Sequence, residues 1–162
     1  MQEVKERSND VVENLEMMLE CAEIQVEIEN DIIANLSNIS SYINIYLDDI
    51  NWAGFYIMRN GELVLGPFQG KAACTRIKIG SGVCGSAVRD KKVYRVDNVL
   101  EFPGHIACDG ASKSEIVIPI IIKNEVFGVL DVDSPSFNRF TEVEEKFLTR
   151  LVNIIEKSID NI

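Results

Sequence analysis

An Asn60-Gly61 pair between two strand-like runs constrains the fold of this chain more than any other feature. The run at 51–58 is rich in aromatic and apolar residues, and a second such run at 62–68 follows the pair almost directly. Asn-Gly tolerates the positive φ angles of a two-residue turn, so this pattern predicts a β-hairpin. A hairpin of this kind indicates an antiparallel sheet.

The remaining elements are predicted from hydrophobic periodicity and capping signals. Apolar residues at helical spacing predict two helices before the hairpin, over about residues 8–24 and 28–46. A capping box of Thr141 and Glu144 predicts a C-terminal helix. Further segments are predicted between them: strands at 75–79 and 93–96, a helix at 82–90, a loop at about 97–113, and a second hairpin from the runs 115–122 and 126–133. This order predicts an α+β fold: a single antiparallel sheet with the terminal helices on one face and ligand-covering loops on the other.

Length, charge and the N-terminal residues limit the functional classes. The 162 residues, 46% of them hydrophobic and 26% charged, are typical of one domain with a packed core. A net charge of −10 disfavours binding to nucleic acid or to an anionic membrane surface, but is compatible with a cationic or zwitterionic small ligand. The first six residues lack the apolar segment of a signal peptide, and no stretch approaches the ~18 apolar residues of a membrane span, so we expect a cytoplasmic location.

Four cysteines in a cytoplasmic chain are better candidates for catalytic, redox or metal-binding roles than for structural disulfides. Cys21 falls within the first predicted helix, where a buried helix thiol is the ordinary interpretation. Cys84 lies near the start of the short helix, whose dipole would favour a thiolate; packing beneath the sheet is the alternative. Cys74 begins a strand close to Arg76, whose charge also favours a thiolate.

Cys108 lies on the long predicted loop, three residues after His105, the only histidine of the chain. His105 is a candidate base for a Cys108 nucleophile, and a solvated loop histidine is the alternative. A Cys3His zinc site of Cys74, Cys84, Cys108 and His105 is a further hypothesis, which the absence of a C-x-x-C pair makes weaker.

Three acidic residues are predicted to converge on the second hairpin. Asp131 and Asp133 are two positions apart on one strand, so their side chains share a face. Glu115 begins the preceding strand of the same hairpin. Neighbouring carboxylates repel one another unless a cation binds between them, so this cluster predicts a site for a positively charged group.

The aromatic residues of the first hairpin suggest the floor of a pocket. Alternation places Trp52, Gly54 and Tyr56 on one face of the strand 51–58. Gly54 has no side chain, so we expect open space between the two rings. Ordinary core packing of both aromatics is the alternative.

Six segments carry a resemblance to a known family: 51–56 (NWAGFY), 65–70 (LGPFQG), 82–85 (GVCG), 104–109 (GHIACD), 114–117 (SEIV) and 130–134 (LDVDS). They resemble the free methionine-(R)-sulfoxide reductases, which are GAF-domain enzymes. The resemblance extends from about residue 30 to the C-terminus and implies a single GAF domain over residues 1–162, with the helix at 8–24 peripheral. A non-enzymatic GAF domain that senses a small molecule is the alternative.

The resemblance implies a thiol-dependent reduction of free L-methionine-(R)-sulfoxide to L-methionine, without a cofactor or metal. Cys108 would attack the sulfoxide sulfur and become a sulfenic acid. A resolving thiol, Cys84 with Cys74 as the second candidate, would then form a disulfide that thioredoxin reduces. Which pair forms the resting disulfide stays open at this point. A homodimer is also implied, and the first two helices are a plausible interface.

The same resemblance gives the acidic and aromatic residues their roles. Glu115, Asp131 and Asp133 would pair with the ammonium group that distinguishes the free amino acid from a methionine within a peptide. One of these acids, with its pKa raised by its neighbours, would protonate the departing sulfoxide oxygen. Trp52 and Tyr56 would hold the S-methyl end of the substrate.

Overall fold

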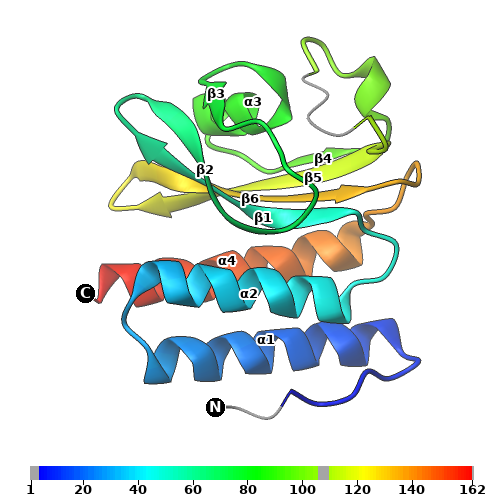
Figure 1. The fold of residues 1–162 in the computed structure, drawn as a ribbon, viewed down its shortest axis with the longest axis vertical. Coiled ribbons are helices and arrows are strands. Elements are labelled where there is room, and N and C mark those ends of the chain that lie inside the picture. Colours follow the sequence, from blue (N-terminus) through cyan, green and yellow to red (C-terminus); the bar gives the residue numbers. More distant parts are fainter. Residues whose placement is uncertain (1–3, 106–109, 162) are drawn as a thin grey trace.

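A computed structural model describes residues 4–105 and 110–161 of the chain. The order of its elements confirms the predicted succession of two helices, a sheet with an inserted helix, and a final helix (Figure 1). The elements are α1 (Val11–Ile28), α2 (Ile32–Tyr46), β1 (Trp52–Arg59), β2 (Glu62–Gly70), β3 (Arg76–Lys78), α3 (Gly82–Asp90), β4 (Tyr94–Val96), a 3-10 turn (Val99–Glu101), β5 (Ser114–Ile122), β6 (Glu125–Ser134) and α4 (Glu142–Asp160). No helix among the described residues is both long and apolar enough to cross a membrane.

The strands form one sheet in the order β3-β2-β1-β6-β5-β4, and every neighbouring pair is antiparallel. Both predicted hairpins are present. Asn60 and Gly61 adopt φ angles of 52° and 84°, and Lys123 and Asn124 adopt 50° and 68°. Positive φ at both central residues matches the right-handed twist of the flanking strands. The two hairpins meet where β1 pairs with β6, in the middle of the sheet.

The helices are distributed unequally over the two faces of the sheet (Figure 1). α2 and α4 pack directly on one face, and α1 packs on the outer side of both. α3 and the connecting loops cover the opposite face. This confirms the predicted division into a face covered by the terminal helices and a face covered by loops, and it places α1 furthest from the sheet.

Local capping defines where the long helices begin. The side chains of Asp10 and Asp31 accept hydrogen bonds from the backbone N–H groups of Glu13 and Ala34. The predicted capping box is present at α4, where the side chains of Thr141 and Glu144 satisfy the free N–H groups of the first turn. Such caps contribute about 1 kcal/mol each to stability.

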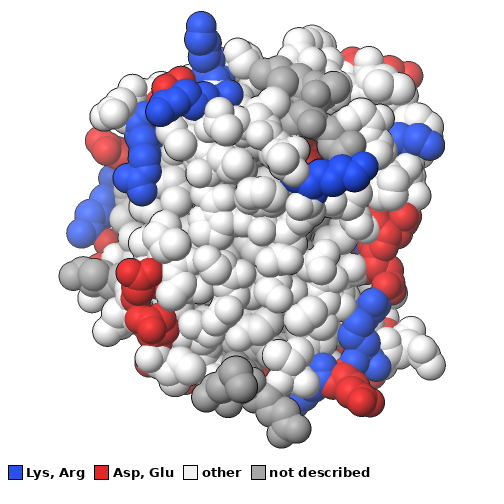
Figure 2. Space-filling view, viewed as in Figure 1, with Lys and Arg blue, Asp and Glu red and all other residues white. Residues whose placement is uncertain are grey.

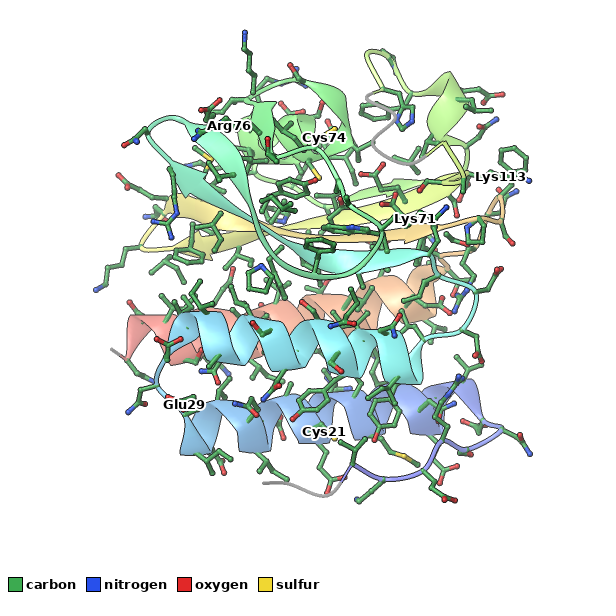
Figure 3. The ribbon with its side chains drawn as sticks, in the orientation of Figure 1. Cys21, Glu29, Lys71, Cys74, Arg76 and Lys113 are labelled. Carbon is green, nitrogen blue, oxygen red and sulfur yellow. The ribbon has the colours of Figure 1, made fainter. Side chains whose placement is uncertain are left out.

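Two apolar cores follow from the alternation of β1. Ala53, Phe55 and Ile57 face the helices and belong to the larger core between α1, α2, α4 and the sheet. Cys21 lies in this larger core, with its Sγ 3.7 Å from Tyr46 Oη, which confirms its interpretation as a buried helix thiol (Figure 3). Trp52 and Tyr56 face the other side and belong to a smaller core with α3.

The expectation of open space above Gly54 is wrong. A Cβ atom at Gly54 would lie 2.3 Å from Phe68 Cβ, because Phe68 is the residue paired with it on β2. The missing side chain therefore allows close approach of β2, and the Phe68 ring stacks on Trp52 with centroids 5.2 Å apart.

Candidate functional site

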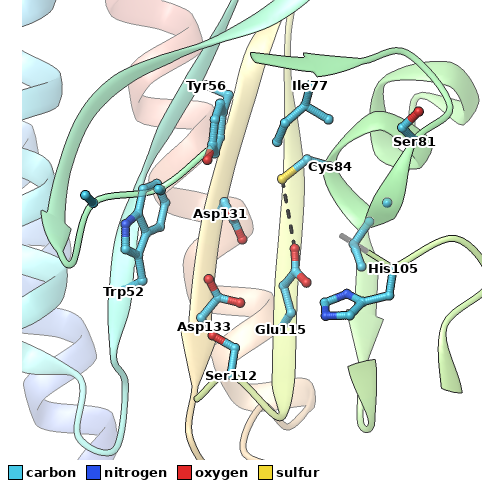
Figure 4. Close-up of a pocket in the computed structure, with 14 residues that line it drawn as sticks. Trp52, Tyr56, Ile77, Ser81, Cys84, His105, Ser112, Glu115, Asp131 and Asp133 are labelled. Atoms are coloured by element: carbon cyan, nitrogen blue, oxygen red, sulfur yellow. Dashed lines mark hydrogen bonds between the residues drawn. The ribbon is translucent and has the colours of Figure 1, made fainter. Parts of the chain in front are cut away.

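The register of the sheet brings an aromatic and two acids into one row. Trp52 on β1 pairs with Asp133 on β6, and Asp133 pairs in turn with Glu115 on β5. Asp131 lies two residues along β6 and therefore on the same face, beside Gly54. The predicted convergence of the three acids is thus a direct result of antiparallel pairing (Figure 4).

A pocket lies over this row of side chains, between the sheet, the start of α3 and two loops (Figure 4). Six of the residues proposed from sequence line it: Trp52, Tyr56, Cys84, Glu115, Asp131 and Asp133. Among the described residues that line the pocket, none is Lys or Arg. Its carboxyl groups therefore face no fixed cationic side chain from that set.

Burial makes the acids of this pocket hold protons more tightly than usual. Burial and the charges of Asp131 and Asp133 raise the pKa of Glu115 well above its ordinary value. Burial also raises the pKa of Asp131, from 3.8 to about 6. Its Oδ1 atom is buried and has no hydrogen-bond partner among the described residues.

Cys84 occupies the first turn of α3, and of its two predicted interpretations the structure supports the packed thiol rather than the thiolate. Only 4% of its surface is exposed, and its Sγ lies 3.9 Å from Glu115 Oε1, to which it donates a weak hydrogen bond (Figure 4). Burial, followed by the negative charges of Asp131 and Glu115, raises the pKa of this thiol well above its ordinary value. Desolvation outweighs the helix dipole here, and Cys84 is a neutral thiol rather than a thiolate.

The other two central cysteines are Cys74 and Cys108, and the structure describes only the first of them. Cys74 is disulfide-bonded, whereas Cys21 and Cys84 are free. The predicted nucleophile Cys108 lies outside the described residues. Because Cys74 is in a disulfide, it cannot supply a thiolate ligand to the zinc site that was hypothesised from Cys74, Cys84, Cys108 and His105.

Two aromatic side chains from β1 fix the segment that carries Cys74 (Figure 3). The Tyr56 hydroxyl donates to the carbonyl oxygen of Cys74 at 3.1 Å, and Trp52 Nε1 donates to the carbonyl oxygen of Lys71 at 3.1 Å. The two rings stack with centroids 5.8 Å apart. The rings that line the pocket therefore also position the backbone of the disulfide-bonded cysteine.

His105 lines the pocket near Glu115 and Ser112 (Figure 4). Burial lowers the pKa of His105, so the imidazole is neutral at pH 7. A neutral imidazole is able to accept a proton, which is compatible with the predicted role of a base. Its proposed partner, Cys108, lies outside the described residues.

Several pocket residues were not identified from the sequence. They belong to the start of α3 with its N-cap and to two loops: Ala72, Ala73, Ser81, Gly82, Val83 and Ser112. Ser112 accepts a hydrogen bond from Asn51 Nδ2 at 3.1 Å, which joins the end of the long loop to the start of β1. The only sequence signal for Ser112 was its place in that long loop, because loops of this length are often functional.

Comparison with known proteins agrees with this geometry. The family model for the GAF domain matches residues 37–160. A protein of Escherichia coli (strain K12) named free methionine-R-sulfoxide reductase is 54% identical over 129 residues, which cover 80% of this chain and 78% of that protein. Protein YtsP of Bacillus subtilis (strain 168) is 48% identical over 158 residues, covering 96% of this chain and 97% of its own.

A solved structure shows the same fold with its ligand. The crystal structure of free methionine-R-sulfoxide reductase from Neisseria meningitidis in complex with its substrate superposes with a TM-score of 0.94 at 37% identity, covering 99% of this chain and 96% of that one. Sequence identity of this extent over nearly the whole length shows common descent and not only a common fold. The chain therefore belongs to the free methionine-(R)-sulfoxide reductase family of GAF-domain proteins.

Proposed function

We propose that this protein reduces free L-methionine-(R)-sulfoxide to L-methionine. The observation that carries the proposal is a group of three carboxyl side chains, the buried Glu115 and Asp131 and the partly buried Asp133, in a pocket that also presents Trp52. A free amino acid brings an ammonium group that neutralises such a cluster, whereas a methionine within a peptide does not. The family relationship supports the same substrate.

The two buried acids suit different steps. Asp131 has a pKa of about 6, and its unpartnered Oδ1 is available to an ammonium group. Burial and neighbouring charges raise the pKa of Glu115 well above the ordinary value, which favours the protonated form of this acid. A carboxylic acid that is protonated at pH 7 is able to donate to the sulfoxide oxygen as it leaves.

The redox step uses two thiols. The Cys108 thiolate attacks the sulfoxide sulfur, the oxygen is transferred to Cys108 as a sulfenic acid, and methionine departs. The thiol of Cys74 then attacks this sulfenic acid, which yields a Cys74–Cys108 disulfide and one water. Cys74 is preferred over Cys84 as the resolving thiol because Cys74 is disulfide-bonded, while Cys84 is free and its raised pKa disfavours a thiolate. Thioredoxin, acting as a dithiol reductant, returns the disulfide to two thiols.

The proposal includes a single GAF domain over residues 1–162 that pairs with a second copy through α2. The 15 residues of α2 contain no charged side chain, although 26% of the whole chain is charged. Figure 2 shows a broad face without Lys, Arg, Asp or Glu over α2 and β2. Depletion of charge is typical of the centre of a protein–protein interface.

Turnover of defined substrates tests the activity. Methionine release is measured from free L-methionine-(R)-sulfoxide, its (S) epimer and N-acetylmethionine-(R)-sulfoxide, each with dithiothreitol and with thioredoxin. We expect turnover of the free (R) form alone, because acetylation removes the ammonium charge. Equal rates on free and acetylated substrate would reject the role of the acids, and no turnover of any form would favour a ligand-sensing GAF domain.

Single-turnover assays of reduced protein separate the cysteines. We expect Cys108→Ser to release no methionine. Cys74→Ser should release about one equivalent and then stop, because its sulfenic acid has no resolving partner. If Cys84→Ser instead shows this arrest while Cys74→Ser recycles normally, the assigned disulfide is wrong.

A further inference from the structure

The buried thiol of Cys84 has no step in the proposed reaction, yet it lies against two carboxyl groups. One ligand atom from each of Cys84, Glu115 and Asp131 falls within 4.8 Å of the others, and all three residues are buried. We propose that these three side chains form a site for Zn²⁺ or a similarly soft divalent cation, at the place where the proposed substrate presents its ammonium group.

The geometry is close to that of a tetrahedral metal site. Cys84 Sγ and Glu115 Oε1 are 3.9 Å apart, and ordinary Zn–S and Zn–O bonds in a tetrahedral site would place them ~3.5 Å apart. Small side-chain rotations are enough to close that difference. Three protein ligands leave the fourth position for water or for another carboxylate of the pocket.

An independent observation points to a missing cation. Asp131 is 94% buried, since its relative exposure is 6%, and its Oδ1 accepts no hydrogen bond from any described residue. A buried carboxylate oxygen without a donor keeps its full desolvation penalty, so a ligand that satisfies it is favoured. No Lys or Arg among the described pocket residues supplies that charge.

The donor set selects the kind of metal. One sulfur and two carboxylate oxygens suit Zn²⁺, whereas Mg²⁺ and Ca²⁺ prefer six or more oxygen ligands. Binding forms a metal–sulfur bond and breaks the S–H bond of Cys84, and it also displaces the proton held by Glu115; the released protons pass to solvent. No oxidant or reductant is required. If the proposed function holds, a bound metal excludes the substrate, because both need Asp131 and Glu115.

Cobalt is the probe for the site, because a Co²⁺–thiolate bond gives a near-ultraviolet charge-transfer band. The wild-type chain is titrated with Co²⁺ while its disulfide is intact, so the remaining free thiols of the described residues are Cys21 and Cys84. We expect the band in wild type and in Cys21→Ser, and its loss in Cys84→Ser. No band in wild type, or an equal band in Cys84→Ser, would overturn the site.

A second variant retains the thiol. Glu115→Gln preserves the shape of the side chain but removes the carboxyl group that would bind the metal as a carboxylate, and we expect its Co²⁺ affinity to fall by at least about tenfold. Unchanged affinity in this variant would overturn the assignment of Glu115 as a ligand, even if Cys84→Ser fails to fold. Thermal unfolding of each variant without metal establishes that it is folded.

Displacement by substrate distinguishes this proposal from the proposed activity. Addition of free L-methionine-(R)-sulfoxide to the cobalt-loaded, disulfide form should reduce the band, without any turnover being needed. A band that persists at saturating substrate, together with its loss in Cys84→Ser, would overturn the overlap with the substrate while the metal site itself stands. A reductase assay that fails, with the cobalt results as expected, would reject the proposed function alone.

Discussion

The two faces of the sheet are made from alternate residues of the same strands but have opposite character. On β6, Leu130 and Val132 are buried against the helices in an apolar core, whereas Asp131 is buried on the opposite face among acids and a thiol. The helix face buries apolar side chains, which stabilises the fold. The pocket face buries the carboxyl groups of Glu115 and Asp131, and the described residues that line the pocket include no Lys or Arg, which opposes folding and favours a ligand. Burial alone therefore does not distinguish a core from a site; the chemistry of what is buried does.

Removing the carboxyl group of Asp131 should give the largest effect on function. We expect Asp131→Ala to lower kcat/KM for free methionine-(R)-sulfoxide at least about a hundredfold, because loss of one partner of a buried charged contact costs about 3–5 kcal/mol. Steady-state kinetics of the folded variant measures this. Near-normal activity would contradict the assignment of the acid cluster to substrate binding.

Leu130, the neighbour of Asp131 on the helix face, should affect stability rather than activity. Leu130 is fully buried against the helices, so we expect Leu130→Ala to lower the free energy of unfolding by about 2–5 kcal/mol. The activity of each folded molecule should change little. Urea unfolding and kinetics at a temperature where the variant is folded test both parts; a large loss of kcat without loss of stability would contradict the separation of the two faces.

Replacing Asp131 by an uncharged residue should stabilise the protein in the absence of substrate. The pKa of Asp131 is raised from 3.8 to about 6, so the folded state favours the protonated form, and its ionisation costs stability as the pH rises through this range. We expect Asp131→Asn to be about 1–3 kcal/mol more stable than wild type at pH 8, with the difference fading below about pH 4, where the acid is protonated in both folded and unfolded states.

Urea unfolding at several pH values measures this difference. The control is Glu125→Gln at the exposed end of the same strand, which should change stability by less than about 0.5 kcal/mol. A destabilised Asp131→Asn at pH 8 would show that Asp131 already has a stabilising partner in the empty pocket.

The smallest effect is expected from one hydroxyl group. Tyr56→Phe retains the ring but removes the hydrogen bond to the carbonyl oxygen of Cys74, worth about 1 kcal/mol. We expect methionine release in a single turnover to be unchanged and disulfide formation to slow several-fold, so that more sulfenic acid is trapped by dimedone.

Tyr46→Phe is the matched control on the helix face, because its hydroxyl donates to the carbonyl oxygen of Lys5 at 3.0 Å. This control should lose a similar amount of stability without any increase in trapped sulfenic acid. Equal trapping in both variants would mean that the hydroxyl of Tyr56 does not position the resolving cysteine.

Much of the fold was accessible from local sequence patterns. The two hairpins follow from turn residues that accept positive φ, and the start of α4 follows from the capping box of Thr141 and Glu144. The grouping of Glu115, Asp131 and Asp133 also followed, since a tight hairpin fixes which residues of its two strands are opposite. Each of these inferences depends on neighbours in the chain, which is why the sequence was sufficient.

The wrong expectation and the open alternative both concern contacts between distant segments. Gly54 was expected to leave space, but β2 approaches closely and Phe68 fills it. For Cys84 the sequence left a thiolate at a helix start and a packed thiol both open, and burial beside Glu115 and Asp131 raises its pKa and decides for the packed thiol. The helix dipole is a local property that a sequence reveals, whereas desolvation depends on everything that packs around the thiol.

The sequence by itself thus determined the hairpins, the capping box of α4, the alternation of the strands and the family to which the chain is similar. Only the tertiary structure decided which thiol is buried and neutral, which cysteine is disulfide-bonded, and that Trp52 and Tyr56 hold the segment before β3. The physical reason is that turns and caps are set by interactions over a few residues. Desolvation, the proximity of charges and long-range hydrogen bonds exist only once strands far apart in the chain have come together.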